Sequence, residues 1–214
     1  MFIPKLHYIS QGDSPKDHIE NIQKACTSGV ELVQLNLKNI SEKKYLKTAN
    51  EVIKITSHFQ TRLIILNHYK IAKDIKADGV FLDNLTICPS EVRKHLYTWQ
   101  LIGVATNTLK DCEFLIAKEV DYLCLGPFKQ VTNTNNSTTE LGLNGYSLIT
   151  EALQTSTPII AFGGVTTKNV LELLKAGVSG VSSSKEITSN FNSIQTFNQL
   201  LNASSTKEQR YTFE

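Results

Sequence analysis

The sequence predicts a single-domain α/β protein whose parallel strands close into a (β/α)8 barrel. Short apolar runs alternate with helical patterns along the chain, and eight such units fit into about 200 residues. Most of the runs are unbroken rather than alternating, as is typical of strands covered on both faces. An open doubly wound sheet is the alternative, but the first strand is followed by Ser10-Gln11-Gly12-Asp13, which lacks a GxGxxG turn. We therefore favour the TIM-barrel arrangement.

Each strand is expected where an apolar run is bounded by polar residues or glycine. The expected strands are Leu6–Ser10, Leu32–Leu37, Arg62–Leu66, Gly79–Leu82, Leu101–Val104, Tyr122–Leu125, Pro158–Ala161 and Gly180–Ser183.

Helices are expected in the intervals between these strands. Ser14-Pro15-Lys16-Asp17 provides a hydroxyl cap, a proline at the first helical position and an acid in the first turn. Ser41 opens the second helix, which carries an apolar stripe. The later helices are expected at 69–76, 90–97, 109–118, 144–154, 167–176 and 189–201.

Two segments interrupt this alternation. Residues 126–143 form a long polar loop, and loops of this length inside a compact domain are usually functional or mobile. Residues 203–214 are polar and are expected to fray. We therefore predict a barrel over residues 1–202 and a polar C-terminal tail over 203–214.

Composition narrows the class of partner. The chain has 214 residues, of which 41% are hydrophobic and 20% charged, and its net charge of +2 gives no reason to expect nucleic acid or a membrane as a partner. No apolar run is long enough for a membrane helix, and the first residues do not resemble a signal peptide. The four cysteines form no CxxC pair, so we expect reduced thiols in a cytoplasmic protein.

Ligands of such barrels bind at the carboxyl ends of the strands, so the residues that leave each strand are the candidates. Gly163 and Gly164 follow the seventh strand, Ser183 ends the eighth, and Ser184 and Lys185 follow it. Glycine N–H groups, hydroxyls and an ammonium group at this position predict a phosphate site. The alternative is a Gly-Gly turn and a serine-rich loop without a ligand.

Gln34, Asn36 and Lys38 alternate along the second strand and its end, which places all three on one face. If that face is the barrel interior, two amides and one ammonium group meet at the mouth. The alternatives are a hydrogen-bonded core residue for Gln34 and a solvated side chain for Lys38.

The remaining strand ends offer hydrogen-bonding groups but no nucleophile. Asn67 and His68 follow the third strand, Asp83 the fourth and Asn107 the fifth. A lone histidine is more often structural than catalytic. Asp83 is the only acid in these turns, so a two-carboxylate magnesium site is hard to assemble, and we assign no metal ligand.

Eight segments occur in the same order as in one known family. They are His7–Ser10, Val33–Lys38, Leu66–His68, Ala77–Leu82, Ile102–Thr108, Asp121–Phe128, Leu141–Leu143 and Ala161–Val165. With these segments, the sequence resembles the thiamine-phosphate synthases (thiamine-phosphate pyrophosphorylases) and the related thiazole tautomerases over nearly its whole length.

The resemblance implies a reaction in thiamine biosynthesis. Such synthases join hydroxymethylpyrimidine diphosphate to thiazole phosphate and release pyrophosphate, with Mg²⁺ and basic side chains stabilising the leaving group. It also implies a small phosphorylated substrate and makes a homodimer plausible.

Individual positions match this family unevenly. Gln34 and Lys38 match its diphosphate-binding stretch, but Asn36 stands in place of an arginine. Asn67 matches, whereas His68 and Thr86 replace the two aspartates that bind Mg²⁺, so the cofactor expected for the family is doubtful in this chain.

The phosphate end and the long loop also differ from the family pattern. Gly164 matches a contact to the thiazole phosphate, and the turn after the eighth strand is altered to Ser183-Ser184-Lys185. Thr132 and Thr134 fall in the threonine-rich stretch, but no lysine closes it, and Asn107 replaces the histidine of the tautomerases.

The carried-over roles give three catalytic candidates: Lys38, Asn67 and Asn107. The substrate-binding candidates are Gln34, Asn36, Thr132, Thr134, Gly163, Gly164, Ser183, Ser184 and Lys185.

Two hypotheses follow. The chain is a thiamine-pathway transferase with a diverged active site, or it is a paralogue that binds a thiazole or thiamine phosphate without turnover. Losing one electrostatic contact to a leaving group typically costs roughly 10²–10³ in rate, so several losses together predict weak synthase activity.

Overall fold

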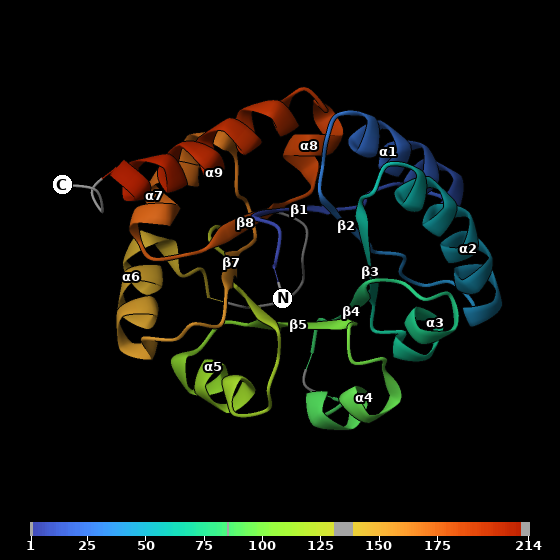
Figure 1. Ribbon diagram of the computed structural model, residues 1–214, viewed down its shortest axis with the longest axis horizontal. Helices are drawn as coiled ribbons and strands as arrows, with labels where there is room; N and C mark the ends of the chain where they lie inside the picture. The colour runs from blue at the N-terminus through green and yellow to red at the C-terminus, as the bar shows by residue number, and fades with distance from the viewer. Residues whose placement is uncertain (1, 85, 131–138, 211–214) are drawn as a thin grey trace.

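The computed structural model describes residues 2–84, 86–130 and 139–210, with side chains as far as residue 202. Eight parallel strands form a closed barrel in which each strand pairs with its neighbours in the chain and β8 pairs with β1 (Figure 1). The predicted fold is therefore confirmed. The strands are β1 Leu6–Ile9, β2 Leu32–Leu35, β3 Arg62–Leu66, β4 Gly79–Leu82, β5 Leu101–Thr106, β6 Tyr122–Leu125, β7 Ile159–Ala161 and β8 Gly180–Ser183.

The helices surround the barrel as an outer ring (Figure 1). They are α1 Pro15–Thr27, α2 Glu42–His58, α3 Tyr69–Asp74, α4 Pro89–His95, α5 Leu109–Ile116, α6 Gly142–Leu153, the 3₁₀ helix η1 Thr167–Asn169, α7 Val170–Lys175, α8 Lys185–Ser189 and α9 Ser193–Arg210.

The apolar residues form two clusters because each strand has two buried faces. The larger cluster lies between the strands and the helices and includes Val33, Leu63 and Val104. The smaller cluster fills the barrel interior and includes Leu32, Ile64, Phe81, Leu101, Tyr122 and Ile160. Successive side chains of a strand point to opposite faces, so the sequence position of a strand residue decides which cluster it joins.

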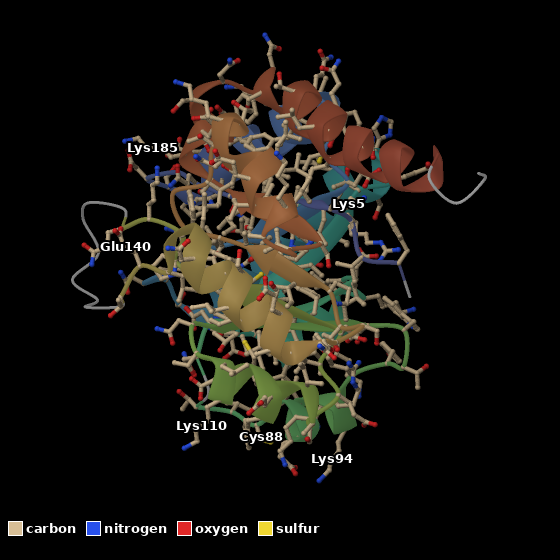
Figure 2. The ribbon with its side chains drawn as sticks, turned by 90° about the vertical axis from the view of Figure 1, so that its left-hand side faces the viewer. Lys5, Cys88, Lys94, Lys110, Glu140 and Lys185 are labelled. Atoms are coloured by element: carbon tan, nitrogen blue, oxygen red, sulfur yellow. The ribbon has the colours of Figure 1, made fainter. Side chains whose placement is uncertain are left out.

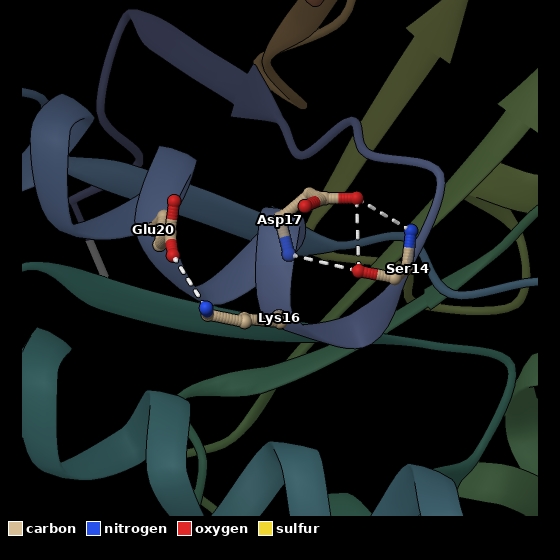
Figure 3. A network of polar contacts seen from close by, with 4 residues as sticks. All are labelled: Ser14, Lys16, Asp17 and Glu20. Carbon is tan, nitrogen blue, oxygen red and sulfur yellow. Dashed lines mark hydrogen bonds and ion pairs between the residues drawn. The ribbon is translucent and has the colours of Figure 1, made fainter.

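The start of α1 forms as its sequence predicts. The Ser14 hydroxyl accepts a hydrogen bond from the Asp17 N–H at 3.3 Å, and the Asp17 carboxylate accepts one from the Ser14 N–H at 2.8 Å (Figure 3). Lys16 and Glu20 form an ion pair one turn apart on the exposed side. This capping box satisfies N–H groups that a helix start leaves unpaired.

The end of the chain differs from the prediction of one helix over 189–201. Two helices are present, because Asn190 adopts an extended backbone (φ −155°, ψ 97°) that ends α8 before α9 begins at Ser193. The helix α9 then continues through 203–210, within the stretch that we assigned to the polar tail. Residues 211–214 lie outside the described residues.

All four cysteines are free thiols, and Cys26, Cys112 and Cys124 are buried. Burial raises the pKa of each of these three thiols. Within the described ranges, no helix combines the length and the hydropathy that crossing a bilayer requires.

Candidate active site at the barrel mouth

A cavity of about 470 Å³ lies at the carboxyl ends of the strands. Its base is apolar and is formed by Leu66, Phe81, Ala105, Cys124 and Phe162. Its polar rim includes Gln34, Asn36, Lys38, Asp83, Thr106, Asn107, Gln130 and Ser182. An apolar pocket with a few converging polar groups is the usual form of a small-molecule site, and its position is the one used by enzymes of this fold.

The second strand supplies three of the predicted residues. Gln34, Asn36 and Lys38 all line the cavity, as their alternation predicts. Gln34 is 5% exposed, and its side-chain amide makes no hydrogen bond to another described residue. A buried amide normally has partners, so this group is available to a ligand. Lys38 is exposed at the rim and carries the positive charge of this side of the site.

Asn107 follows β5 and also lines the cavity. Ser182 lines it as well, whereas the residues predicted from the sequence were its neighbours Ser183 and Ser184. Strand alternation could have identified Ser182, because Gly180 and Ser182 share the face of β8 that points into the barrel. Ser182 is 3% exposed, so its hydroxyl belongs to the inner wall rather than to the loop.

Asn67 and Asp83 join the ends of β3 and β4. The Asn67 side-chain amide donates to the Asp83 carboxylate at 2.8 Å, and the Asp83 N–H donates to Oδ1 of the Asn67 side chain at 3.1 Å. The Asn84 amide donates to the same oxygen, Oδ1 of Asp83, at 2.8 Å. Asp83 lines the cavity, whereas Asn67 supports it from the side.

The two positions that replace aspartates in the resemblance do not line this cavity. The His68 ring packs against Tyr45 with 4.4 Å between ring centroids. Thr86 is exposed, and its N–H donates to Asn84 at 3.0 Å. Asp83 is thus the only carboxylate among the described residues that line the cavity.

Gly163 and Gly164 both have positive φ angles, 86° and 67°. This backbone is strained for residues with a side chain, and it turns the chain after β7 toward the loop after β6. The Phe128 N–H donates to the Phe162 carbonyl at 2.8 Å and the Lys129 N–H to the Gly163 carbonyl at 3.1 Å. Among the described residues, no acceptor pairs with the N–H of Gly163 or Gly164, and Gly163 lines the cavity.

The turn after β8 uses its hydroxyl groups internally. Ser183 donates to the Val165 carbonyl at 3.1 Å, and Ser184 donates to the Ile9 carbonyl at 2.8 Å. These bonds tie the loops after β7 and β1 to the turn. Lys185 is exposed and lies at the same end of the molecule as Glu140, away from Lys5 (Figure 2).

The structure therefore brings Gln34, Asn36, Lys38, Asn107 and Gly163 together around one cavity. Five other candidates are not among its described lining residues: Asn67, Gly164, Ser183, Ser184 and Lys185. Thr132 and Thr134 lie outside the described residues. The substrate-binding and catalytic roles of all of these residues remain predictions.

Comparison with known proteins identifies the family. The family model for thiamine monophosphate synthase matches residues 6–187. A thiamine-phosphate synthase from Flavobacterium johnsoniae is 32% identical over 187 residues, which covers 86% of this chain and 88% of that protein. One from Flavobacterium psychrophilum is 32% identical over 199 residues, covering 92% and 97%.

A solved structure shares the fold. Thiamine phosphate pyrophosphorylase from Pyrococcus furiosus superposes with a TM-score of 0.78 at 20% identity, covering 92% of this chain and 96% of that one.

Proposed function

Because the chain belongs to the thiamine monophosphate synthase family, we propose that it acts in thiamine biosynthesis by joining hydroxymethylpyrimidine diphosphate to thiazole phosphate. In this reaction, the bond between the pyrimidine methylene carbon and the diphosphate oxygen breaks, pyrophosphate leaves with the electron pair, and the thiazole nitrogen forms the new carbon–nitrogen bond. The observation that carries the proposal is the mouth cavity, which has an apolar base and the polar groups Gln34, Lys38 and Asn107 on its rim.

The chemistry of the rim supports a division of roles. Lys38 provides a cation for the diphosphate, and a charge-assisted contact strengthens as negative charge develops on the leaving oxygen. The amide of Gln34, which has no partner among the described residues, and the amide of Asn107 suit the polar edge of a heterocycle. The N–H groups of Gly163 and Gly164 suit the phosphate of the thiazole.

The donor set at this mouth does not fit a magnesium site made by two carboxylates. Asp83 is a single carboxylate, and its Oδ1 already accepts hydrogen bonds from two amides, at 2.8 Å each. Mg²⁺ prefers an octahedral shell of oxygen ligands, usually with one or two carboxylates and the substrate phosphates. We therefore assign no step of the reaction to a metal ion held by this chain.

The same features favour a second candidate function, binding of a thiazole or thiamine phosphate without turnover. Asn36 lines the cavity as an uncharged amide where the family resemblance has an arginine. A site that keeps its phosphate end but has fewer charges for a leaving pyrophosphate would bind product and substrate better than it stabilises the transition state.

A pyrophosphate-release assay separates the two functions. Purified protein is mixed with both substrates, with and without Mg²⁺, and pyrophosphate is followed at high protein concentration. Release that depends on the thiazole phosphate supports the synthase. Complete absence of release rules out the synthase reaction and leaves the binding function.

Calorimetry with thiazole phosphate tests the binding that both functions share. We expect binding that weakens in Gly164→Ala and in Lys185→Ala. Lys94→Ala is the matched control, because Lys94 pairs with Glu91 on the surface of α4, outside the mouth. Absence of heat with the unmodified protein would contradict both functions.

A further inference from the structure

Three hydrogen bonds run in a line behind the mouth, from the end of β2 to the start of α1. The Asn36 N–H donates to Ser10 Oγ at 3.0 Å, Ser10 Oγ lies 2.8 Å from His18 Nδ1, and His18 Nε2 lies 3.1 Å from the Gly12 carbonyl oxygen. Ser10 is fully buried and His18 is 6% exposed. Both side chains are thus largely covered by protein.

The backbone groups at the two ends of this line determine the direction of the bonds that they make. A backbone N–H can only donate and a backbone carbonyl can only accept. His18 therefore carries a proton on Nε2, toward Gly12. Burial lowers the pKa of His18 and so favours the neutral ring, in which Nδ1 accepts the proton of the Ser10 hydroxyl.

The line replaces a backbone bond that the sheet does not provide. Pairing between β1 and β2 ends at Ile9 and Gln34, and the last bond of that ladder runs from the Ser10 N–H to the Gln34 carbonyl at 3.0 Å. Asn36 lies beyond it, so its N–H has no strand partner. The Ser10 hydroxyl supplies the missing acceptor. It thereby keeps the backbone extended beyond the end of β2 as far as Asn36.

The orientation of the Asn36 and Lys38 side chains depends on this extended backbone at Asn36. Both side chains line the mouth cavity because the chain keeps its alternation past the end of β2. His18 lies in the first turns of α1, whose start is fixed by the capping box of Ser14 and Asp17 (Figure 3). The Ser10 hydroxyl thus connects the start of α1 to the backbone at the rim of the site.

We propose that Ser10 and His18 are positioning residues that hold the Asn36 backbone so that Asn36 and Lys38 face the phosphorylated substrate. Neither residue touches the substrate in this scheme. The part that concerns substrate rests on the proposed function, whereas the part that concerns the backbone does not.

The backbone part is tested by NMR without any substrate. We expect the ¹⁵N shifts of the His18 ring to be those of a neutral ring protonated on Nε2. We expect the Asn36 amide to exchange with solvent about fivefold to tenfold faster in Ser10→Ala and in His18→Phe, the change that loss of one hydrogen bond produces. His18→Gln offers an acceptor and a donor at the same place and should keep the exchange rate close to that of the unmodified protein.

Asn21→Ala is the matched control, because the Asn21 amide donates to the Gln11 carbonyl at 2.9 Å in the same loop but outside this line. Unchanged Asn36 exchange in Ser10→Ala, or equal acceleration in Asn21→Ala, would overturn the proposal. If His18→Phe does not fold, Ser10→Ala and His18→Gln decide the result.

The substrate part is tested with hydroxymethylpyrimidine diphosphate, by kcat/KM where turnover occurs and otherwise by calorimetric Kd. We expect roughly a 10-fold to 100-fold loss in Ser10→Ala and His18→Phe, recovery in His18→Gln and no change in Asn21→Ala. Full activity or binding in Ser10→Ala, despite faster Asn36 exchange, would overturn the positioning role. If the unmodified protein neither binds nor reacts, the proposed function fails, while the exchange result still stands.

Discussion

Asn67 and Asp83 hold each other across the ends of β3 and β4 through two reciprocal hydrogen bonds, of 2.8 Å and 3.1 Å. Asn67 does so from a left-handed backbone (φ 57°), a conformation that asparagine tolerates better than most residues. The pair fixes the one carboxylate that faces the cavity from the described lining.

Two substitutions of Asn67 should separate the contribution of its hydrogen bonds to Asp83 from the cost of its left-handed backbone. Asn67→Gly removes the hydrogen bonds and keeps the backbone unstrained, so the free energy of unfolding should fall by about 1 kcal/mol. Asn67→Ala adds the cost of a positive φ angle and should lose about 1 kcal/mol more. Urea unfolding measures both. Equal stability of the two variants would contradict a strained backbone at this position.

Gly163→Ala should destabilise the protein through a contact as well as through φ. A Cβ atom there would lie 2.5 Å from Pro127 Cβ and 2.7 Å from Pro127 Cα, and φ is 86°. We expect the free energy of unfolding to fall by about 2–4 kcal/mol, measured in urea.

Gly29→Ala is the control for this substitution. Gly29 has φ 87°, and a Cβ atom there would meet nothing within 4 Å, so only the backbone term of about 1 kcal/mol should appear. The difference between the two variants isolates the packing of the loop after β7 against Pro127. A Gly163→Ala cost no larger than that of Gly29→Ala would argue against close packing there.

Because the buried His7 ring has a lowered pKa, we expect the protein to lose stability at acidic pH. Burial lowers its pKa from 6.5 to about 4 in the folded protein, and its Nε2 donates to the Pro4 carbonyl at 3.0 Å. As the pH falls, His7 binds a proton near pH 6.5 in the unfolded chain but only near pH 4 in the folded protein. The free energy of unfolding therefore decreases as the pH falls from about 6.5 to about 4. Between pH 7 and pH 5 the contribution is about 2 kcal/mol.

Comparison with His7→Gln isolates this contribution, because glutamine does not titrate and has an amide that can donate to Pro4. The free energy of unfolding is measured in urea at several pH values for both proteins. The stability of the variant should fall less steeply between pH 7 and pH 5. Identical slopes would show that His7 is not held in its neutral form.

Tyr122→Phe should leave stability unchanged or raise it by up to about 1 kcal/mol. The Tyr122 hydroxyl lies in the barrel interior and has no hydrogen-bond partner among the described residues. Removing an unpaired buried polar group relieves its desolvation cost.

Tyr45→Phe is the opposite case. The Tyr45 hydroxyl donates to the Leu35 carbonyl at 2.8 Å and accepts from the Leu66 N–H at 3.2 Å, so its loss should cost about 1–3 kcal/mol. Thermal unfolding of both variants provides the comparison. A destabilised Tyr122→Phe would indicate that an internal water molecule pairs with the Tyr122 hydroxyl.

Lys38→Met should weaken binding of hydroxymethylpyrimidine diphosphate about 10-fold to 100-fold, because it removes the ammonium group at the rim and keeps the aliphatic part of the side chain. The measurement is calorimetric Kd. Lys43→Met is the control, since Lys43 is exposed on α2 and does not belong to the described lining. Equal affinity of the two variants would place the diphosphate away from Lys38.

The sequence was sufficient for the arrangement of the strands. All eight predicted strands are present, with ends that differ by at most two residues, because an apolar run between polar residues identifies a strand buried on both faces. The expected strand Leu32–Leu37 stops at Leu35 in the structure, since its neighbour β1 ends at Ile9 and offers no further backbone partner. Strand ends depend on the neighbouring strand, which the local sequence does not contain.

The site was predicted where residues alternate along one strand and missed where partners come from distant elements. The spacing of Gln34, Asn36 and Lys38 was enough to place them on one face. Ser182 was missed because the phosphate prediction used the turn after β8 and not the alternation along that strand, which places Ser182 and Gly180 on its inward face.

The chain by itself thus determined the fold class and the family, because these follow from local patterns repeated along the sequence. Only the tertiary structure decided that Asn67 supports Asp83, that Ser183 and Ser184 donate to backbone carbonyls, and that Ser10 joins His18 to Asn36. Hydrogen bonds need atoms within about 3 Å, and closure of the barrel brings these residues to that distance from separate parts of the chain.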